Sequence, residues 1–432
     1  MKKPAFKTLT LDKIVGGGQA LGTCDDGRKL FAWGGLPSEA VTVEITKKKS
    51  HLLEGIVTSV EQPSEERIAP RDPDSYLSTS PWQIMTFDAE QHYKSALIEE
   101  AFELHNIVLP EPINVHADGN HYEYRNKIEY SFWYDTERLQ LDLAFFRRGT
   151  HGKIPITMTS LAAPAITTLS QSILATLNEL HIEGRALKTL MIRSNRQGET
   201  AWQLYVKDRD FPAEKLLSSL PKNSAICGEV IFSEPKSPAS VITERLASTS
   251  TQTLSDTILD VPFRYATEGF FQINLPVYEQ ALRDMKTWVE PDKPVVDMYS
   301  GVGSIGLTIG GENVTLVEVN EHAVREMKRN IAEQGREKTA NAVLAASEHA
   351  TDYITPGSFI IVDPPRAGLH QDVVKKLLEA APSRIIYLSC NPVTQARDIA
   401  LLAEKYGIRA HKGYNFFPRT PHIEHLVILD LK

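Results

Sequence analysis

The sequence contains no long apolar run. None of its apolar stretches approaches the roughly 20 residues that a membrane-spanning helix needs. The start of the chain, Met1-Lys2-Lys3-Pro4, leads into a polar, alternating segment rather than the apolar stretch of a secretory signal. We therefore expect a cytoplasmic protein that works away from membranes.

Cysteine is scarce as well. The three cysteines among 432 residues are Cys24, Cys227 and Cys390, an odd and low number that indicates a reducing compartment and no disulfide framework. Three scattered thiols also cannot supply the four ligands that an iron–sulfur cluster takes from cysteine. The sequence therefore predicts no iron–sulfur cluster and no other metal site.

Excess positive charge is absent, because 47 Lys and Arg residues stand against 55 Asp and Glu residues and give a formal net charge of -8. A nucleic-acid partner favours a basic surface because its phosphates are negative. Basic side chains do gather locally, in the three lysines at 47–49, at Arg125 with Lys127, and at 147–148 with Lys153. A charged run is more often a solvated face, so charge alone leaves an RNA partner open.

Short strands and glycine turns fill the first 60 residues. The candidate strands lie at 6–14, 30–33, 40–45 and 53–60, a pattern typical of a small β-barrel. Residues 89–105 have the apolar periodicity of a helix.

The remaining chain falls into two parts. The middle, about 110–260, mixes strands with helices, and from Pro294 onward apolar strands alternate with helices. The second pattern predicts a parallel α/β sheet.

Three carboxylates end strands of this sheet. Asp297 precedes a glycine turn at 301–303, Glu318 ends the next strand, and Asp363 ends a third and is followed by two prolines. Open α/β sheets bind ligands at the carboxyl ends of their parallel strands, and an acid about twenty residues after the first strand suits a ribose diol. We therefore expect a ligand site at this edge.

The glycine turn has more than one interpretation. The run at 301–306 satisfies the Gly-x-Gly-x-x-Gly pattern of dinucleotide-binding oxidoreductases. An acid just before the loop, here Asp297, is typical instead of enzymes that use S-adenosylmethionine. The pattern alone decides little.

A thiol follows a further apolar strand. A lone cysteine in a strand is usually buried as a small hydrophobe, but Cys390 lies at the strand end, on the edge predicted for the three acids. A thiol there would face the cleft as a nucleophile. Further on, Glu424 stands between His422 and His425, and the position of this segment favours a catalytic use over a solvated loop.

A thiol and a carboxylate beside a methyl donor suit methylation at C5 of uracil. C5 is a poor nucleophile until a thiolate adds to C6, and a base must afterwards remove the C5 proton so that the cysteine can leave. The uracil must also leave its stack. The aromatic pairs at 270–271 and 416–417 are candidate linings for it, although such pairs are more often core.

These segments together resemble the RNA 5-methyluridine methyltransferases that carry an N-terminal TRAM domain, and the resemblance covers essentially the whole chain. The motifs that carry it are Gly269-Phe270-Phe271-Gln272-Ile273-Asn274, the segment 297–303, Asp363-Pro364-Pro365-Arg366-Ala367-Gly368, Ser389-Cys390-Asn391-Pro392 and Pro421-His422-Ile423-Glu424. The resemblance implies an OB-like TRAM barrel over 1–62, an α+β central RNA-binding domain over 63–262 and a Rossmann-like class I catalytic domain over 263–432. The helix near 89–105 would pack on the catalytic domain.

The resemblance also implies roles for single residues. Cys390 would be the nucleophile and Glu424 the base. S-adenosylmethionine would be held by Gln272, Tyr299, Ser304, Glu318 and Asp363. The signature at 124–127 would meet RNA through Arg125 and Lys127.

The substrate expected from the resemblance is a uridine of large-subunit (23S) ribosomal RNA, with uridine-54 of transfer RNA as the second candidate, and the expected enzyme is a monomer. One departure bears on this choice. Many members carry four cysteines for an iron–sulfur cluster, whereas the corresponding stretch here, Asp72 to Gln83 with a later position near Ser160, has none. This puts in doubt any substrate inferred from cluster-bearing relatives.

Three other functions fit these residues less well. A non-catalytic RNA-binding protein that kept the fold is opposed by the intact Cys390, Glu424 and Asp363. Amino-group methyltransferases usually pair an Asp/Asn-Pro-Pro turn with an aromatic residue, whereas Arg366 follows the prolines here. Cytosine-C5 enzymes also use a cysteine, but the Glu424 segment favours uridine.

Overall fold

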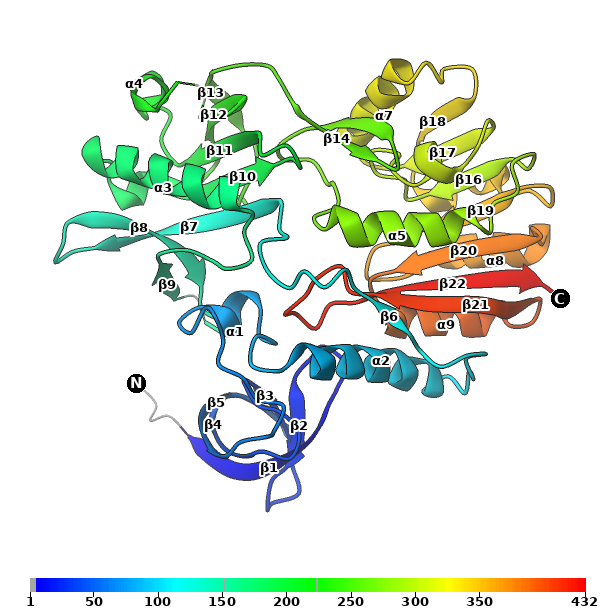
Figure 1. The fold of residues 1–432 in the computed structure, drawn as a ribbon, viewed down its shortest axis with the longest axis horizontal. Coiled ribbons are helices and arrows are strands. Elements are labelled where there is room, and N and C mark those ends of the chain that lie inside the picture. Colours follow the sequence, from blue (N-terminus) through cyan, green and yellow to red (C-terminus); the bar gives the residue numbers. More distant parts are fainter. Residues whose placement is uncertain (1–4, 151, 223) are drawn as a thin grey trace.

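The computed structural model describes residues 5–150, 152–222 and 224–432. It contains a closed barrel at the N-terminal end, a seven-stranded sheet, a two-stranded ribbon, and an eight-stranded sheet at the C-terminal end (Figure 1). Within those residues, no helix has both the length and the apolar character needed to cross a membrane. The predicted fold class, α/β with an N-terminal barrel and a Rossmann-like C-terminal part, is confirmed.

The barrel has the strand order β1-β2-β3-β5-β4 and is closed by antiparallel pairing of β1 with β4. Alternate side chains of each strand point inward, so the short apolar alternations found in the sequence fill the interior. Closure also leaves no free sheet edge. The strands are β1 (Phe6–Ile14), β2 (Ala20–Thr23), β3 (Lys29–Trp33), β4 (Ala40–Lys48) and β5 (Leu52–Gln62).

Two helices follow the barrel, α1 (Tyr76–Thr79) and α2 (Phe87–Glu103). Thr86 caps the N-terminus of helix α2, because its side chain accepts a hydrogen bond from the Ala89 N–H at 3.3 Å. Apolar residues of α2, among them Ile98 and Phe102, join a hydrophobic cluster with strands of the C-terminal sheet. In Figure 1 the helix lies along that sheet, beside α9 (Pro392–Leu402).

The seven-stranded sheet, which is the central sheet of the molecule in chain order, has the strand order β13-β12-β11-β10-β7-β8-β9. Helices α3 (Pro164–Glu179) and α4 (Ala213–Ser219) bury their apolar sides against it. A single turn of 3-10 helix, Gly184–Ala186, precedes β10. The strands are β7 (Lys127–Asp135), β8 (Gln140–Phe146), β9 (Lys153–Ile156), β10 (Leu187–Ser194), β11 (Thr200–Val206), β12 (Cys227–Phe232) and β13 (Glu244–Ser248).

The C-terminal sheet has the order β18-β17-β16-β19-β20-β22-β21-β6. Its first five strands are parallel, and β22 pairs antiparallel with β20. The strands are β6 (Val115–His116), β16 (Val295–Met298), β17 (Val314–Glu318), β18 (Ala340–Leu344), β19 (Phe359–Val362), β20 (Arg384–Ser389), β21 (Tyr406–Tyr414) and β22 (Glu424–Leu431). The ribbon that precedes it pairs β14 (Leu254–Ile258) with β15 (Val261–Tyr265).

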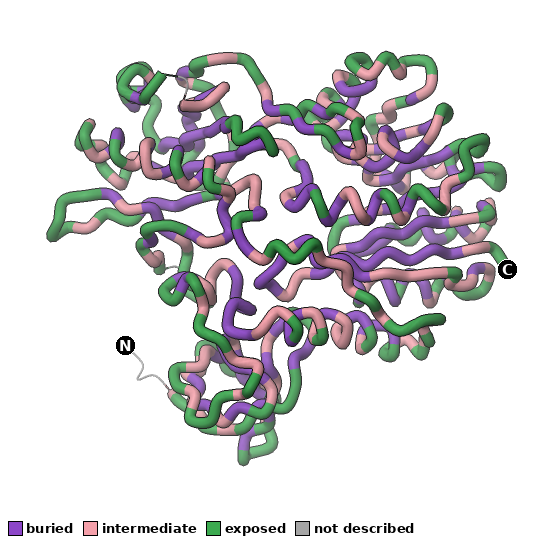
Figure 2. Tube along the Cα trace, in the orientation of Figure 1, coloured by how far each residue is buried: buried purple, intermediate pink, exposed green. Residues whose placement is uncertain are grey.

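Helices cover both faces of this sheet. Because successive side chains of a strand point to opposite faces, Val295 and Val296 of β16 enter two different hydrophobic clusters. The parallel strands are therefore buried on both sides, as Figure 2 shows. The remaining elements are α5 (Leu275–Lys286), α6 (Gly306–Ile309), α7 (Glu321–Glu333), α8 (Gln371–Ala380) and the 3-10 turns Ser347–His349 and Thr351–Tyr353.

A buried polar network occupies the stretch in which many members of the resembled family carry cluster cysteines. The Asp72 carboxylate accepts hydrogen bonds from the Ser160 N–H at 3.1 Å, from the Ser160 hydroxyl at 2.9 Å and from the Gln83 amide at 3.1 Å. The Gln83 amide also donates to the Ser80 hydroxyl at 2.7 Å. The network thus joins the segment after the barrel to the segment that precedes α3.

We expect Asp72→Ala to destabilise the protein by about 2 kcal/mol, because it leaves buried donors without their charged acceptor. The measurement is the midpoint of urea denaturation, which should fall. Asp74→Ala is the matched control, since Asp74 is exposed and its loss should leave the midpoint unchanged. Equal midpoints for the two variants would show that the network adds nothing to stability.

Candidate active site

The residues singled out in the C-terminal sequence meet at one edge of the sheet. Glu318 ends β17, Asp363 follows β19 and Cys390 follows β20, all at the carboxyl ends of parallel strands. Strand β22 runs the opposite way, so its first residue, Glu424, lies at the same edge, and Ser389 pairs with His425. The register therefore sets Glu424 beside Cys390.

The thiol lies in a strongly acidic surrounding. Burial, together with the nearby Glu424 and Asp363 carboxyls, raises the pKa of Cys390 to about 11, and the Arg366 guanidinium opposes this rise. Cys390 is half-buried, whereas Cys24 and Cys227 are buried. The thiol is thus accessible but protonated at neutral pH, and a nearby cation is the group that favours its thiolate.

Two carboxyl groups share this site. Glu424 is 5% exposed, and its burial, followed by the nearby Asp363, raises its pKa well above the usual range. Burial also raises the pKa of Asp363 to about 7. Both groups are therefore held toward the protonated form, and a carboxylate formed at Glu424 is a stronger base than an exposed one.

Arg366 belongs to the site although the sequence analysis assigned it no role. Its guanidinium bonds to Nδ1 of His422 at 3.2 Å, and its backbone carbonyl accepts the Asn391 amide at 2.8 Å and the Thr394 hydroxyl at 3.2 Å. These bonds fasten the turn after Asp363 to the start of α9, directly after Cys390. The signal was present in the sequence, as an arginine directly after the two prolines.

The loop after β16 is shaped by backbone conformation. Tyr299, Gly301 and Gly303 all have positive φ, at 66°, 57° and 86°, which is costly for a residue other than glycine and marks a functional turn. The Glu318 carboxylate accepts the Gly301 N–H at 2.9 Å. The Tyr299 hydroxyl accepts a bond from Ser347 at 2.8 Å.

Ser304 and Asp297 make hydrogen bonds that support this loop. The Ser304 hydroxyl bonds to the Tyr278 hydroxyl of α5 at 2.8 Å. Asp297 is fully buried, one of its oxygens accepts the Gly306 N–H at 2.8 Å, and burial raises its pKa to about 8. Asp297 therefore supports the loop from within rather than facing its open side.

The segment before α5 is held by a side chain from the residue before β7. The backbone carbonyl of Gln272 accepts the Asn126 amide at 2.9 Å, and Gln272 is 9% exposed. Asn274 is 2% exposed, and its side-chain amide has no hydrogen-bond partner among the residues that the structure describes.

The two basic residues expected to meet RNA differ in their surroundings. Burial, together with the Arg366 and Arg125 charges, lowers the pKa of His422 to about 4. The Arg125 charge therefore acts on His422, which bonds to Arg366 at the site. Lys127 instead pairs with Glu129 at 3.3 Å on β7, and its burial lowers its pKa.

Other candidates have structural contacts. The Arg148 guanidinium stacks 4.0 Å from the centre of the Trp33 ring and donates to the Leu77 carbonyl, so it ties the central sheet to the barrel. The predicted catalytic use is wrong for His425, which is fully buried and bonds to Gln395 at 2.7 Å. It points to the opposite face of β22 from Glu424, because strand neighbours alternate.

The aromatic pairs divide between core and surface. Phe271 and Phe416 are buried in the core, and Phe271 stacks on Tyr265 with ring centres 4.0 Å apart. Phe270 is 71% exposed, and the partly buried Phe417 meets His422 edge to face at 5.8 Å. One member of each pair is thus available to a ligand.

Comparison with known proteins decides the family. The sequence model of the tRNA (uracil-5-)-methyltransferase family matches residues 87–432, well over half of the chain. The chain belongs to this family. As a member of the tRNA (uracil-5-)-methyltransferase family it is an RNA methyltransferase.

Relatives cover nearly the whole chain. An uncharacterized RNA methyltransferase of Enterococcus faecalis is 28% identical over 424 residues, which are 93% of this chain and 92% of the relative. One of Lactiplantibacillus plantarum is 28% identical over 433 residues, 94% and 93% of the two chains. The crystal structure of Pyrococcus abyssi tRNA (uracil-54, C5)-methyltransferase in complex with S-adenosyl-L-homocysteine matches with a TM-score of 0.78 and 21% identity, over 98% of this chain and 100% of that one, which shows the shared fold.

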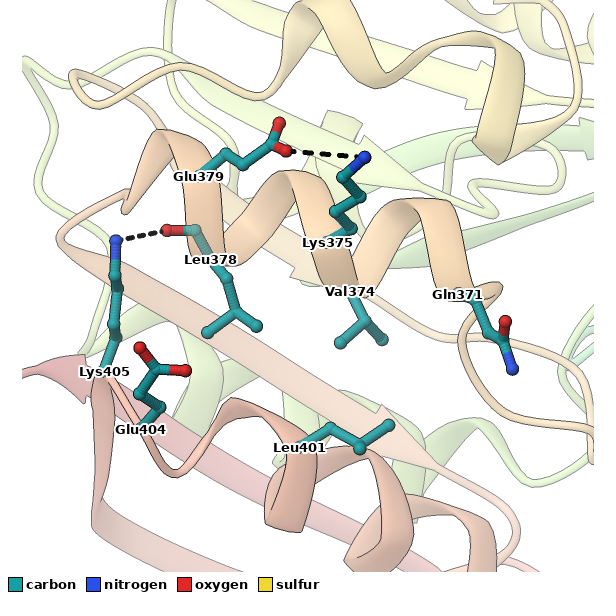
Figure 3. A pocket seen from close by; sticks show the side chains of 8 residues that line it. All are labelled: Gln371, Val374, Lys375, Leu378, Glu379, Leu401, Glu404 and Lys405. Atoms are coloured by element: carbon teal, nitrogen blue, oxygen red, sulfur yellow. Dashed lines mark hydrogen bonds and ion pairs between the residues drawn. The ribbon is translucent and has the colours of Figure 1, made fainter.

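A shallow hollow elsewhere on this family member does not coincide with the site. Figure 3 shows it between α8 and α9, where Val374, Leu378 and Leu401 form its apolar floor. The ion pair of Lys375 with Glu379 borders it. It contains neither Cys390 nor any of the acids described above.

We expect alkylation of Cys390 by iodoacetamide to accelerate about tenfold per pH unit from pH 8 to 10 and to level off near pH 11, because only the thiolate reacts. Arg366→Gln should raise the pKa of Cys390 and slow alkylation at pH 9. Mass spectrometry of the Cys390 peptide measures the rate. Arg209→Gln, in the loop after β11 where Arg209 pairs with Glu244, should leave the rate unchanged. Equal rates in all three proteins would deny Arg366 this effect.

Proposed function

We propose that this family member transfers a methyl group from S-adenosylmethionine to C5 of a uridine in RNA, with Cys390 as nucleophile and Glu424 as base. The observation that carries the proposal is the meeting of the Cys390 thiol with the buried Glu424 carboxyl at one sheet edge. A lone buried cysteine would have no such neighbour. The pairing matches what C5 methylation requires, one group that adds to C6 and one that takes the C5 proton.

The residues at the ends of β16, β17 and β19 fit the cofactor. The positive φ of Tyr299 and Gly301 turns the backbone at the strand end, where α/β sheets take their ligands. We assign Gln272, Tyr299, Ser304, Glu318 and Asp363 to its binding, with Glu318 placed for ribose hydroxyls and Asp363 for a positive charge. When bound, S-adenosylmethionine supplies an electrophilic methyl group on a positively charged sulfur.

The protein's own groups account for the remaining steps. Cys390 first gives up its thiol proton to solvent, and the thiolate Sγ then forms a bond to C6 of uracil while the electron pair of the C5–C6 double bond moves toward O4, which makes C5 nucleophilic. Glu424 must likewise release its proton to solvent, and after C5 has taken the methyl group the resulting carboxylate removes the C5 proton. The double bond reforms, the C6–Sγ bond breaks, and Cys390 leaves with that electron pair as a thiolate.

Charge in the site suits this order. Arg366 is the cation beside Cys390 and favours the thiolate that must add and later leave. The acids raise the basicity of the thiol, so the thiolate, once formed, is a strong nucleophile. The burial of Glu424 gives the base the strength to take a carbon-bound proton.

RNA would enter over the barrel and the central sheet. We propose a TRAM-type barrel over 1–62 and a central domain over 63–262 as RNA-binding units, with the catalytic domain over 263–432. We assign Arg125 to the target nucleotide, because its charge acts on His422, and Lys127 to the flanking chain. A uridine of large-subunit ribosomal RNA is the favoured substrate. Transfer RNA is the second candidate, supported by the similarity to the Pyrococcus abyssi transfer-RNA enzyme.

The catalytic pair makes a direct prediction. Glu424→Gln should reduce turnover by about 10²–10⁴-fold and accumulate a covalent protein–RNA adduct, because the adduct is methylated but cannot lose its C5 proton. Denaturing gels with radioactive methyl donor measure it. Cys390→Ala is the control and should give neither product nor adduct. Normal turnover by Cys390→Ala would refute the nucleophile.

The substrate is tested by mapping. A strain that lacks this gene should lose 5-methyluridine from one site or a few sites of large-subunit ribosomal RNA and keep it in transfer RNA. Mass spectrometry of nuclease digests of both RNAs measures this. Loss from transfer RNA alone would favour the second candidate, and complementation with Cys390→Ala, which should not restore the nucleoside, is the control.

A further inference from the structure

The turn that leads into Glu424 is buried and strained. Residues 415–423 connect β21 to β22, and Glu424 is the first residue after them. Asn415 and Thr420 are at most 1% exposed, and Arg419 is 4% exposed. Arg419 has φ 65°, a left-handed conformation that a residue with a side chain seldom adopts unless its surroundings impose it. The 415–423 turn therefore depends on outside contacts for its shape.

Helix α2 supplies the central contacts. The Glu90 carboxylate accepts the Arg419 N–H at 3.0 Å and the Asn415 amide at 2.8 Å. The Lys94 ammonium donates to the Phe417 carbonyl at 3.1 Å and to the Asn415 side-chain oxygen, and it pairs with Glu90 at 3.1 Å. The Glu90 and Lys94 side chains are both fully buried. Burying an ion pair costs desolvation free energy that the attraction between the two charges often does not offset. Because this pair bonds to a single turn, its contacts point to a role in positioning that turn.

Further groups hold the same backbone from other parts of the chain. The backbone N–H of Trp82 donates to the Arg419 carbonyl at 3.1 Å, and the Tyr124 hydroxyl donates to the Pro418 carbonyl at 2.9 Å. Gly18 of the barrel lies so close to Pro421 that a methyl group on it would come within 2.1 Å. Three consecutive carbonyls, 417–419, are thus fixed from outside the turn.

The backbone that carries the nucleophile is supported from β20 and α9. Cys390 lies between these elements, and its neighbour Asn391 holds the Arg366 carbonyl at 2.8 Å. The Arg366 guanidinium also bonds to His422 of the turn at 3.2 Å, but in the described part of the chain no hydrogen bond joins Asn391 or Arg366 to Glu90 or Lys94. Loss of the α2 contacts should therefore displace Glu424 while Cys390 keeps its place.

We propose that Glu90 and Lys94 are positioning residues for the base, because they fix the 415–423 turn so that the Glu424 carboxyl faces the adduct on Cys390. The inference rests on the proposed function. Removal of a proton from carbon needs close alignment, and a displacement of about 1 Å can cost about 10²-fold in rate. Addition by Cys390 does not use Glu424. The signature is a selective loss in the second half of the reaction.

The experiment follows the adduct in single turnover. Full-length Glu90→Gln and Lys94→Met are mixed with RNA from a deletion strain and S-adenosylmethionine that carries a radioactive methyl group. Denaturing gels then give the rates of adduct formation and decay. We expect decay to slow at least about tenfold and formation to stay within about threefold of the natural protein. Tyr124→Phe, which removes one hydroxyl and keeps the ring, should slow decay in the same direction by less.

Asp72→Ala is the matched control for lost stability, because Asp72 bonds within another buried network and does not touch the 415–423 turn. It should leave the ratio of decay to formation unchanged. Equal slowing of both steps in the α2 variants and in Asp72→Ala, or unchanged decay in the α2 variants and Tyr124→Phe, would overturn the inference. Absence of an adduct even in Glu424→Gln would instead overturn the proposed function itself.

Discussion

The antiparallel pairing of β22 with β20 is the constraint on which the site depends. Parallel strands alone bring Glu318, Asp363 and Cys390 to one edge, because each of these residues follows or ends a strand of the same direction. Glu424 begins its strand, and it reaches that edge only because β22 runs the other way and pairs Ser389 with His425. A shift of this register by one residue would turn Glu424 to the opposite face, where His425 now packs in the core.

Burial gives this edge its chemical character. The carboxyls of Asp363 and Glu424 and the thiol of Cys390 all have pKa values raised by it. Three groups that prefer to be neutral can lie together without strong repulsion. Arg366 is the cation that acts on this cluster, and its turn is fastened to α9 by Asn391 and Thr394. The reactive groups are thus kept protonated at rest and close enough to exchange charge once a substrate binds.

The three parts of the chain converge on the 415–423 turn. Gly18 of the barrel contacts this turn, and so do Trp82 and helix α2 in the segment that follows the barrel. Tyr124, which lies just before β7 of the seven-stranded sheet, bonds to the turn as well. Helix α2 lies between the barrel and the central sheet in sequence but packs with the C-terminal sheet. The parts proposed to bind RNA therefore contact the turn that leads into the strand carrying the base. These contacts support the catalytic edge in a way that the C-terminal sheet alone would not.

The sequence by itself determined the classes of element and the edge at which they act. Alternation and glycine turns predicted the barrel strands, and apolar strands ending in Asp297, Glu318, Asp363 and Cys390 predicted a shared site, because strand direction follows from the α/β pattern. Only the tertiary structure decided which polar residues face that site. Arg366 and the pair Glu90–Lys94 are separated by up to hundreds of residues from the groups that they serve, and His425 differs from Glu424 by a single position. Periodicity shows that a side chain is buried, but its partner depends on long-range packing, which local sequence does not encode.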